Sequence, residues 1–308
     1  MKRIYLIMAV MVVFAIVTHI ALDNVGYHKI QLDDGILYGK ASGKDKDLVV
    51  LIAAGSGPTD MDGNSPLLQG RNDCFLQMAK SLEREGISTF RYDKRTAGKS
   101  AGSFDFTNME FERFVDDFVG VIRYLKEQGY QKIFVMGHSK GSLVGMLASL
   151  EEPIDGFISI GGTGVPIDVT LEKQLSTYYS EESLEMKTLQ SLKEGKTDPT
   201  ISDEHPLFNL ENQRFFLTWM EHDPGEIISR LDIPILLIHG EADSQVDNAD
   251  FEALKAGSKD AEALIIKNMN HVMKEVFTDD DNIASYSDPS YPLHNELVPG
   301  IVEFISFF

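Results

Sequence analysis

The chain has 308 residues, of which 43% are hydrophobic and 25% are charged, as expected for one large globular domain or two small ones. Its net charge of −20 at pH 7 argues against nucleic-acid binding and against general attraction to anionic lipid. Because Cys74 is the only cysteine, no intrachain disulfide can form, and stability must come from the hydrophobic core. We expect a structural role for this thiol, which lies within a predicted helix over Asp73–Glu85.

The first 24 residues differ in kind from the rest of the chain. Lys2 and Arg3 precede an apolar run over Ile4–Val17, and further apolar residues extend it to position 22. As a helix, residues 4–22 would be about 28 Å long, just enough to span a bilayer. The segment therefore predicts a signal peptide or an N-terminal membrane anchor, which would tether the protein through residues 4–22. We expect an exported protein, either secreted or anchored in the cell membrane with its domain outside.

From residue 25 to 308, strand and helix patterns alternate, which predicts one α/β domain. The expected strands are Tyr27–Leu32, Ile36–Lys40, Leu48–Ala54, Gly86–Tyr92, Ile133–Met136, Gly156–Ile160, Ile233–Ile238 and Ala263–Lys267. The expected helices are Asp73–Glu85, Phe111–Leu125, Ser142–Leu150, Asp250–Ala256 and Leu297–Phe307. Asp33-Asp34-Gly35 indicates a hairpin turn, and Thr107 with Glu110 has the spacing of a capping box. The alternation predicts a mostly parallel sheet with helices on both faces.

The stretch from Val165 to Arg230 interrupts this alternation, because it contains helical patterns and no convincing strand. The expected helices are Leu171–Ser180, Glu182–Glu194 and Asn209–Met220. The stretch leaves the predicted sheet after one strand and returns before the next. We therefore predict a helical lid, over about residues 165–230, above the carboxyl edge of the sheet, where ligands of such sheets bind.

Gly137-His138-Ser139-Lys140-Gly141 is a G-x-S-x-G motif between a predicted strand and a predicted helix. A strand, a sharp turn and a helix form the context of a nucleophile elbow, in which the turn lifts the serine hydroxyl above the sheet edge. The alternative is an ordinary glycine-containing loop with a surface serine.

An activated serine needs a base, most often a histidine held by a carboxylate. His271 follows the last predicted strand and lies at the correct sheet edge, and His294 is a weaker alternative. Asp243 lies in the loop after the preceding predicted strand, with Glu241 and Asp247 as nearby rivals. The resulting chain order of nucleophile, acid and base is the order expected of α/β-hydrolases.

From about Tyr27 to the C-terminus, the sequence resembles serine α/β-hydrolases. It is most similar to bacterial acyl esterases and lipase-like hydrolases related to the dienelactone-hydrolase and serine-aminopeptidase groups. Besides the motif and the segment HGEADSQV, the likeness includes the loop AAGSGPTDMDGN and the stretch YDKRTAGKS, which resembles Y-D-x-R-G-x-G-x-S. Two positions depart from the family pattern: Ala54-Gly55 replaces the common His-Gly, and Ala97 replaces a usual glycine.

The resemblance implies a carboxylic-ester hydrolase that acts through an acyl-enzyme on a small-molecule ester. Ser139 would attack the carbonyl, His271 would carry the proton, and Asp243 would orient the imidazole. Backbone N–H groups of Lys140 and Ser56 would bind the oxyanion. No cofactor is implied, and the aspartates near residue 60 lack the spacing of a calcium loop.

Two lid residues, Phe215 and Trp219, are candidates to line an acyl pocket, with helical core packing as the alternative. Asp93 and Arg95 are expected to be structural. Two other functions stay open: an aminopeptidase or amidase with the same triad, and a catalytically inactive, membrane-tethered binding protein.

Overall fold

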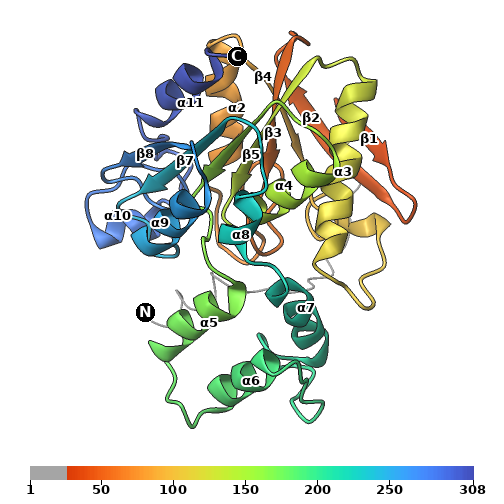
Figure 1. The fold of residues 1–308 in the computed structure, drawn as a ribbon, viewed down its shortest axis with the longest axis vertical. Helices are drawn as coiled ribbons and strands as arrows, with labels where there is room; N and C mark the ends of the chain where they lie inside the picture. The colour runs from red at the N-terminus through yellow and green to blue at the C-terminus, as the bar shows by residue number, and fades with distance from the viewer. Residues whose placement is uncertain (1–25) are drawn as a thin grey trace.

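The computed structural model describes residues 26–308, and its centre is one eight-stranded sheet in the order β1-β2-β4-β3-β5-β6-β7-β8 (Figure 1). The strands are β1 (His28–Gln31), β2 (Ile36–Ser42), β3 (Leu48–Ala53), β4 (Ser88–Tyr92), β5 (Lys132–His138), β6 (Gly156–Ile160), β7 (Ile235–Gly240) and β8 (Glu262–Ile266). The pairs β1–β2 and β2–β4 are antiparallel, and all other neighbours are parallel. The predicted signal peptide or anchor over residues 1–24 lies outside the described residues.

Helices cover both faces of the sheet. They are α2 (Cys74–Arg84), α3 (Glu112–Glu127), α4 (Lys140–Glu151), α5 (Ile167–Ser176), α6 (Leu184–Lys193), α7 (Leu210–Met220), α8 (Pro224–Ile228), α9 (Asn248–Gly257), α10 (Asp279–Ala284) and α11 (Leu297–Ile305). One face packs against α2 and α11, and the other against α3, α4, α8 and α9. Within residues 26–308, no helix combines the length and the apolar character needed to cross a membrane.

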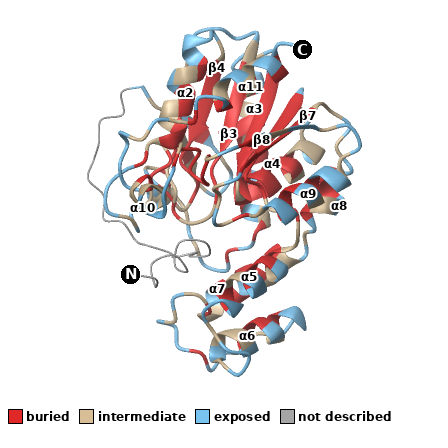
Figure 2. Cartoon of the chain, turned by 90° about the vertical axis from the view of Figure 1, so that its left-hand side faces the viewer, coloured by how far each residue is buried: buried red, intermediate tan, exposed pale blue. Residues whose placement is uncertain are grey.

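The central strand β3 shows why the sheet is covered on both sides. Its side chains alternate, so that Val49 and Leu51 join the core beneath α3 and α4. Val50 and Ile52 join the core beneath α2 and α11. A strand that is apolar at every position therefore fits only between two helical layers. Figure 2 shows these strands buried within a more exposed outer shell.

The α/β-hydrolase fold predicted from the sequence is confirmed, with a mostly parallel eight-stranded sheet flanked by helices. All eight predicted strands are present, and their bounds shift by at most a few residues. The capping box was wrong: α3 begins at Glu112, and the Thr107 hydroxyl instead donates to Asp105. The short helices α8 and α10 were not predicted, because runs of five or six residues carry too little periodicity.

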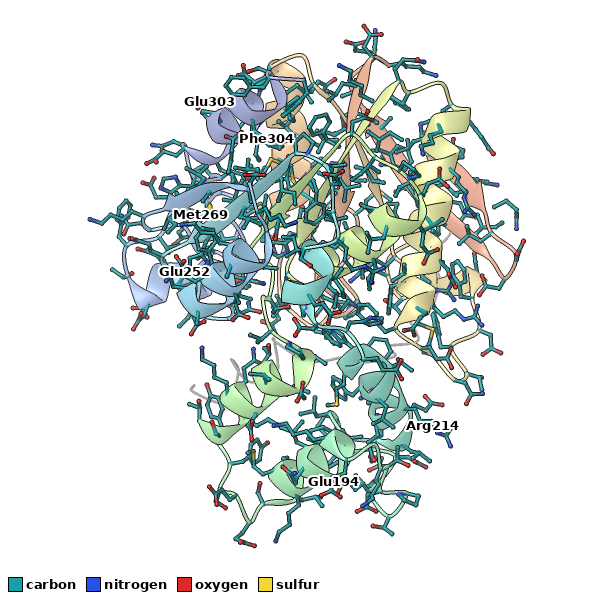
Figure 3. All side chains as sticks on the ribbon, in the orientation of Figure 1. Glu194, Arg214, Glu252, Met269, Glu303 and Phe304 are labelled. Atoms are coloured by element: carbon teal, nitrogen blue, oxygen red, sulfur yellow. The ribbon has the colours of Figure 1, made fainter. Side chains whose placement is uncertain are left out.

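Helices α5, α6 and α7 lie between β6 and β7 and extend beyond the carboxyl ends of the parallel strands (Figure 1). In Figure 3, Glu194 and Arg214 mark this segment, and Glu303 and Phe304 on α11 mark the opposite end of the molecule. The strands β5, β6, β7 and β8 all end at the edge that faces the segment. The loops carrying the predicted site residues therefore converge at this edge.

Candidate active site

Ser139 occupies a strained turn between β5 and α4. Its backbone has φ 54° and ψ −128°, in the left-handed half of φ space that non-glycine residues rarely adopt. The Ser139 N–H donates to the carbonyl of Ile160 on β6 at 3.0 Å, which fixes the turn to the neighbouring strand. Ser139 is half-buried, whereas the other four residues of its pentapeptide are buried. The turn therefore presents the serine and hides its neighbours, as a nucleophile elbow requires.

The two motif glycines permit this turn because the backbone around them is closely packed. A Cβ at Gly137 would lie 2.4 Å from the Cα of Ser142. A Cβ at Gly141 would lie 2.3 Å from the carbonyl oxygen of Ala53 on β3. These neighbours are backbone atoms, which cannot rotate away as a side chain can. The motif is thus required by the packing of β3, β5 and α4.

His271 and Asp243 form a buried hydrogen-bonded pair beside the elbow. The imidazole Nδ1 lies 2.7 Å from Asp243 Oδ2, and the two side chains are 5% and 2% exposed. The other carboxylate oxygen accepts the N–H groups of Gln245 and Val246 at 2.8 and 3.0 Å. Burial alone would raise the pKa of Asp243, but His271 and these N–H groups hold that pKa below its usual value. The aspartate is thereby kept ionised and fixed in orientation.

The rival residues occupy other positions. Glu241 is exposed, and Asp247 caps α9 by accepting N–H groups of that helix. His294 is buried 3.8 Å from Glu275 rather than beside Asp243. The structure therefore brings together His271 and Asp243, the two residues that the sequence analysis preferred.

His138 has a part in the site that the sequence analysis missed. Its Nε2 donates to the backbone carbonyl of His271 at 2.7 Å, and the centroids of the two rings are 4.7 Å apart. Burial, and then the nearby His271, lowers the pKa of His138 to about 3, so the ring stays neutral. The residue before the serine therefore fastens the loop that carries His271. No local sequence signal announces a contact between positions 133 residues apart.

The loop after β3 lies directly against the elbow. A Cβ at Gly55 would be 2.9 Å from the Cβ of Ser139, so this loop and the serine are in close contact. Ser56 follows and is half-buried. Among the described residues, the Ser56 N–H has no hydrogen-bond acceptor. Lys140 opens α4, and the first N–H groups of a helix lack acceptors within that helix. Both predicted oxyanion donors therefore belong to segments that adjoin Ser139.

The side chain of Lys140 is buried among aromatic rings. Its Nζ lies 3.7 Å from the ring centroid of Phe114 on α3, and 5.6 and 5.7 Å from those of Phe215 and Trp219 on α7. Ring faces attract a cation, but burial lowers the pKa of Lys140 to about 7. Phe215 and Trp219 are themselves buried, and Trp219 stacks on Phe111 at 5.4 Å. Phe215 and Trp219 thus pack α7 against the start of α3 beside Lys140.

The remaining residues of interest have structural partners. Asp93 accepts the backbone N–H groups of Met61 and Lys99, both at 2.8 Å. Arg95 forms a buried pair with Asp117 at 2.6 Å. Within residues 26–308, no three His, Cys, Asp or Glu side chains gather in a group that could hold a metal ion.

This arrangement, on this fold, is that of a serine hydrolase of the α/β-hydrolase class. More particularly, the chain belongs to the family described as serine aminopeptidase, S33, whose model matches residues 70–276. The chain is also 32% identical over 236 residues to esterase EstD of Thermotoga maritima, a match that covers 73% of this chain and 54% of EstD. It therefore spans about half the length of that curated relative.

Solved structures share the fold at low sequence identity. Est1E from Butyrivibrio proteoclasticus with bound ferulic acid superposes with a TM-score of 0.59 at 17% identity, covering 91% of this chain and 99% of Est1E. Mouse alpha/beta hydrolase domain-containing protein 10 also gives 0.59, at 16% identity, covering 91% of this chain and 98% of the mouse protein. At these identities the likeness extends to the fold alone.

Proposed function

We propose that the protein hydrolyses carboxylic esters through an acyl-enzyme formed on Ser139. The observation that carries the proposal is the buried His271–Asp243 pair, at 2.7 Å, on the same sheet edge as the strained and half-buried Ser139. Ester hydrolysis is favoured over amide hydrolysis because EstD is named an esterase and is 32% identical.

In this mechanism, Ser139 Oγ attacks the carbonyl carbon while His271 Nε2 takes its proton. The Asp243 carboxylate accepts the Nδ1–H of His271, which leaves Nε2 free as the base and stabilises the imidazolium that forms. N–H groups of Lys140 and Ser56 bind the oxyanion of the tetrahedral intermediate. The imidazolium then protonates the leaving alcohol, and water attacks the acyl-enzyme by the same steps in reverse. The acyl group would lie beneath Phe215 and Trp219.

Amide hydrolysis is the second candidate, because the matching family is described as serine aminopeptidase. Purified protein should be assayed side by side with a chromogenic acetate ester and an aminoacyl p-nitroanilide. We expect kcat/KM to be far higher for the ester, and the reverse preference would assign the protein to the peptidases.

A fluorophosphonate probe separates both activities from an inactive binding protein. We expect stoichiometric labelling of the wild type and none of Ser139→Ala. His271→Ala should also abolish turnover, whereas His294→Ala should leave most of it. A wild type that neither reacts with the probe nor hydrolyses either substrate would contradict the proposal.

Export is a separate proposal that depends on residues 1–24. We propose that this segment directs the protein out of the cytoplasm and either is cleaved or tethers the domain to the membrane through residues 4–22. N-terminal sequencing of the native protein, with fractionation of its cells, distinguishes the two fates. An intact protein in the cytoplasmic fraction would contradict both.

A further inference from the structure

Lys94, just after the end of β4, reaches into the loop that carries Ser56. Its side chain is buried, and its Nζ donates to the carbonyl oxygens of Gly55 and Gly57, the latter at 2.8 Å. The contact arises because β3 and β4 are parallel neighbours, with Ile52 paired to Arg91. The loops after the two strands therefore emerge side by side at the sheet edge of the elbow.

The two acceptors of Lys94 lie on either side of Ser56. The carbonyl of Gly55 belongs to the same planar peptide as the Ser56 N–H. The described residues contain no cis peptide bond, so in this trans peptide the N–H points opposite to the carbonyl. An ammonium that binds the Gly55 oxygen thus aims the Ser56 N–H away from itself. A hydrogen bond to the carbonyl also polarises the peptide, which makes its N–H a stronger donor.

The electrostatic setting of Lys94 differs from that of a surface lysine. Buried charges are normally paired, yet Lys94 forms no ion pair with any carboxylate of residues 26–308. Burial, and then the charge of Lys140, holds the pKa of Lys94 well below its usual value. Two lysines are therefore buried around the elbow of a protein whose net charge is −20. The carboxylate of Asp60 acts on Lys94 in the opposite direction and partly offsets the lowering of its pKa.

We propose that Lys94 is a positioning residue, which fixes the Gly55–Ser56 peptide so that the Ser56 N–H faces the oxyanion formed at Ser139. This inference rests on the proposed ester hydrolysis. Lys94 does not touch the substrate and transfers no proton. Its effect should therefore appear in the stability of the tetrahedral intermediate and leave ground-state binding almost unchanged.

The first test replaces Lys94 by methionine, which has a similar length and no charge. Removing one oxyanion donor costs about 10²–10³ in kcat, and we expect about 10–100-fold for Lys94→Met because the donor itself remains. KM for a short ester should change less than about threefold. The inhibition constant of a trifluoromethyl ketone, which forms a tetrahedral adduct with the serine, should rise by the factor by which kcat/KM falls.

Lys274→Met is the matched control for the loss of a buried lysine. Lys274 is fully buried and also donates to two oxygens, of Gln77 and Tyr291, but it joins α2 to the loop between α10 and α11. We expect this variant to lose stability much as Lys94→Met does, while kcat stays within about threefold of wild type. If Lys94→Met and Lys274→Met lost kcat to a similar extent, the loss would follow from lower stability, and the proposal would be overturned.

Chemical rescue keeps the proposal testable if Lys94→Met folds poorly. In Lys94→Ala, added propylammonium should raise kcat several-fold with saturation, and propanol should not. An inhibition constant for the ketone that is unchanged in both Lys94 variants would overturn the proposal. If the wild type itself hydrolyses no ester, the proposed function is wrong. This result differs from the one that would overturn only the role of Lys94.

Discussion

Two loops meet at Ser139, and their shapes have different origins. The elbow after β5 is fixed by backbone packing, since Gly137 and Gly141 leave no room for a Cβ. The loop after β3 is fixed by a side chain from the loop after β4, that of Lys94. The two glycines stand within two residues of the serine, although Gly141 packs against Ala53 on β3, and Lys94 acts across 37–39 positions. Two neighbouring loops of one site can therefore differ in origin. A local sequence motif marks the elbow, whereas a residue distant in the sequence holds the loop after β3.

The largest expected effect comes from removing the Ser139 hydroxyl, which leaves both loops in place. In Ser139→Ala, kcat for a chromogenic ester should fall on the order of 10⁶-fold, as for other serine nucleophiles. The free energy of unfolding, measured in urea, should change little, because the hydroxyl is lost from a half-buried position. Residual activity above a few per cent in protein free of wild type would contradict the assignment.

Two glycine substitutions test the contrast between the loops directly. Gly141→Ala would place a Cβ 2.3 Å from the Ala53 carbonyl oxygen, so we expect a stability loss of at least about 3 kcal/mol. Gly55→Ala would meet the Cβ of Ser139 at 2.9 Å and the carbonyl oxygen of His138 at 3.2 Å, which is a less severe contact. We expect it to lower stability by about 1–3 kcal/mol and kcat/KM by about 10–100-fold. Urea unfolding and ester kinetics on both variants check this, and the opposite ranking of stabilities would refute the contrast.

The helices above both loops should contribute stability and select the acyl group. Trp219 is 4% exposed and stacks on Phe111, so Trp219→Ala should destabilise the protein by about 3–5 kcal/mol. We also expect a larger loss of kcat/KM for hexanoate than for acetate esters. Melting curves measure the loss of stability, and kcat/KM values for the hexanoate and acetate esters measure the change in selectivity. Equal losses for both esters would show that Trp219 packs the lid without contacting the acyl chain.

A further prediction concerns Lys140, the lysine buried beside the elbow. With a pKa of about 7 in the folded protein and about 10.4 in the unfolded chain, Lys140 is protonated mainly in the unfolded state between these values. The unfolded state then binds more protons, so this residue makes stability rise with pH across that window. The penalty for burying its charge is present in full below pH 7.

Lys140→Met should therefore raise the free energy of unfolding at pH 7 by about 2–5 kcal/mol. Between pH 7 and 10, the free energy of unfolding should rise with pH less steeply than in the wild type. The difference in slope should be about 1.4 kcal/mol per pH unit, which corresponds to one proton. Urea unfolding at several pH values measures both quantities. An unchanged slope would mean that Lys140 keeps its charge among the rings.

The contrast between local and distant contacts also explains which features could be predicted from the sequence. The strands, the sharp turn at Ser139 and the nearness of Asp243 to His271 could be predicted, because apolar runs, glycine spacing and loop position are local or follow from parallel topology. The hydrogen-bonded pair of Asp243 and His271 then forms at the common edge of β7 and β8.

The contributions of Lys94 and His138 could not be predicted in the same way. Both act through hydrogen bonds to backbone carbonyls of distant residues, and a carbonyl is present at every position of the chain. No residue type at the accepting end marks such a contact. The burial of Lys140 was likewise hidden, since its aromatic neighbours come from two helices about 100 residues apart.

The burial of Cys74 has a practical consequence for labelling chemistry. Its side chain is 2% exposed, and burial raises its pKa to about 12, so almost no reactive thiolate exists at neutral pH. Towards maleimides, the wild-type protein should therefore behave as if it had no cysteine. New cysteines at the exposed positions Glu194 and Glu252, beside α6 and on α9, would then be the only sites to react. A fluorophore pair there could measure the distance between α6 and α9 in solution without first removing a native thiol.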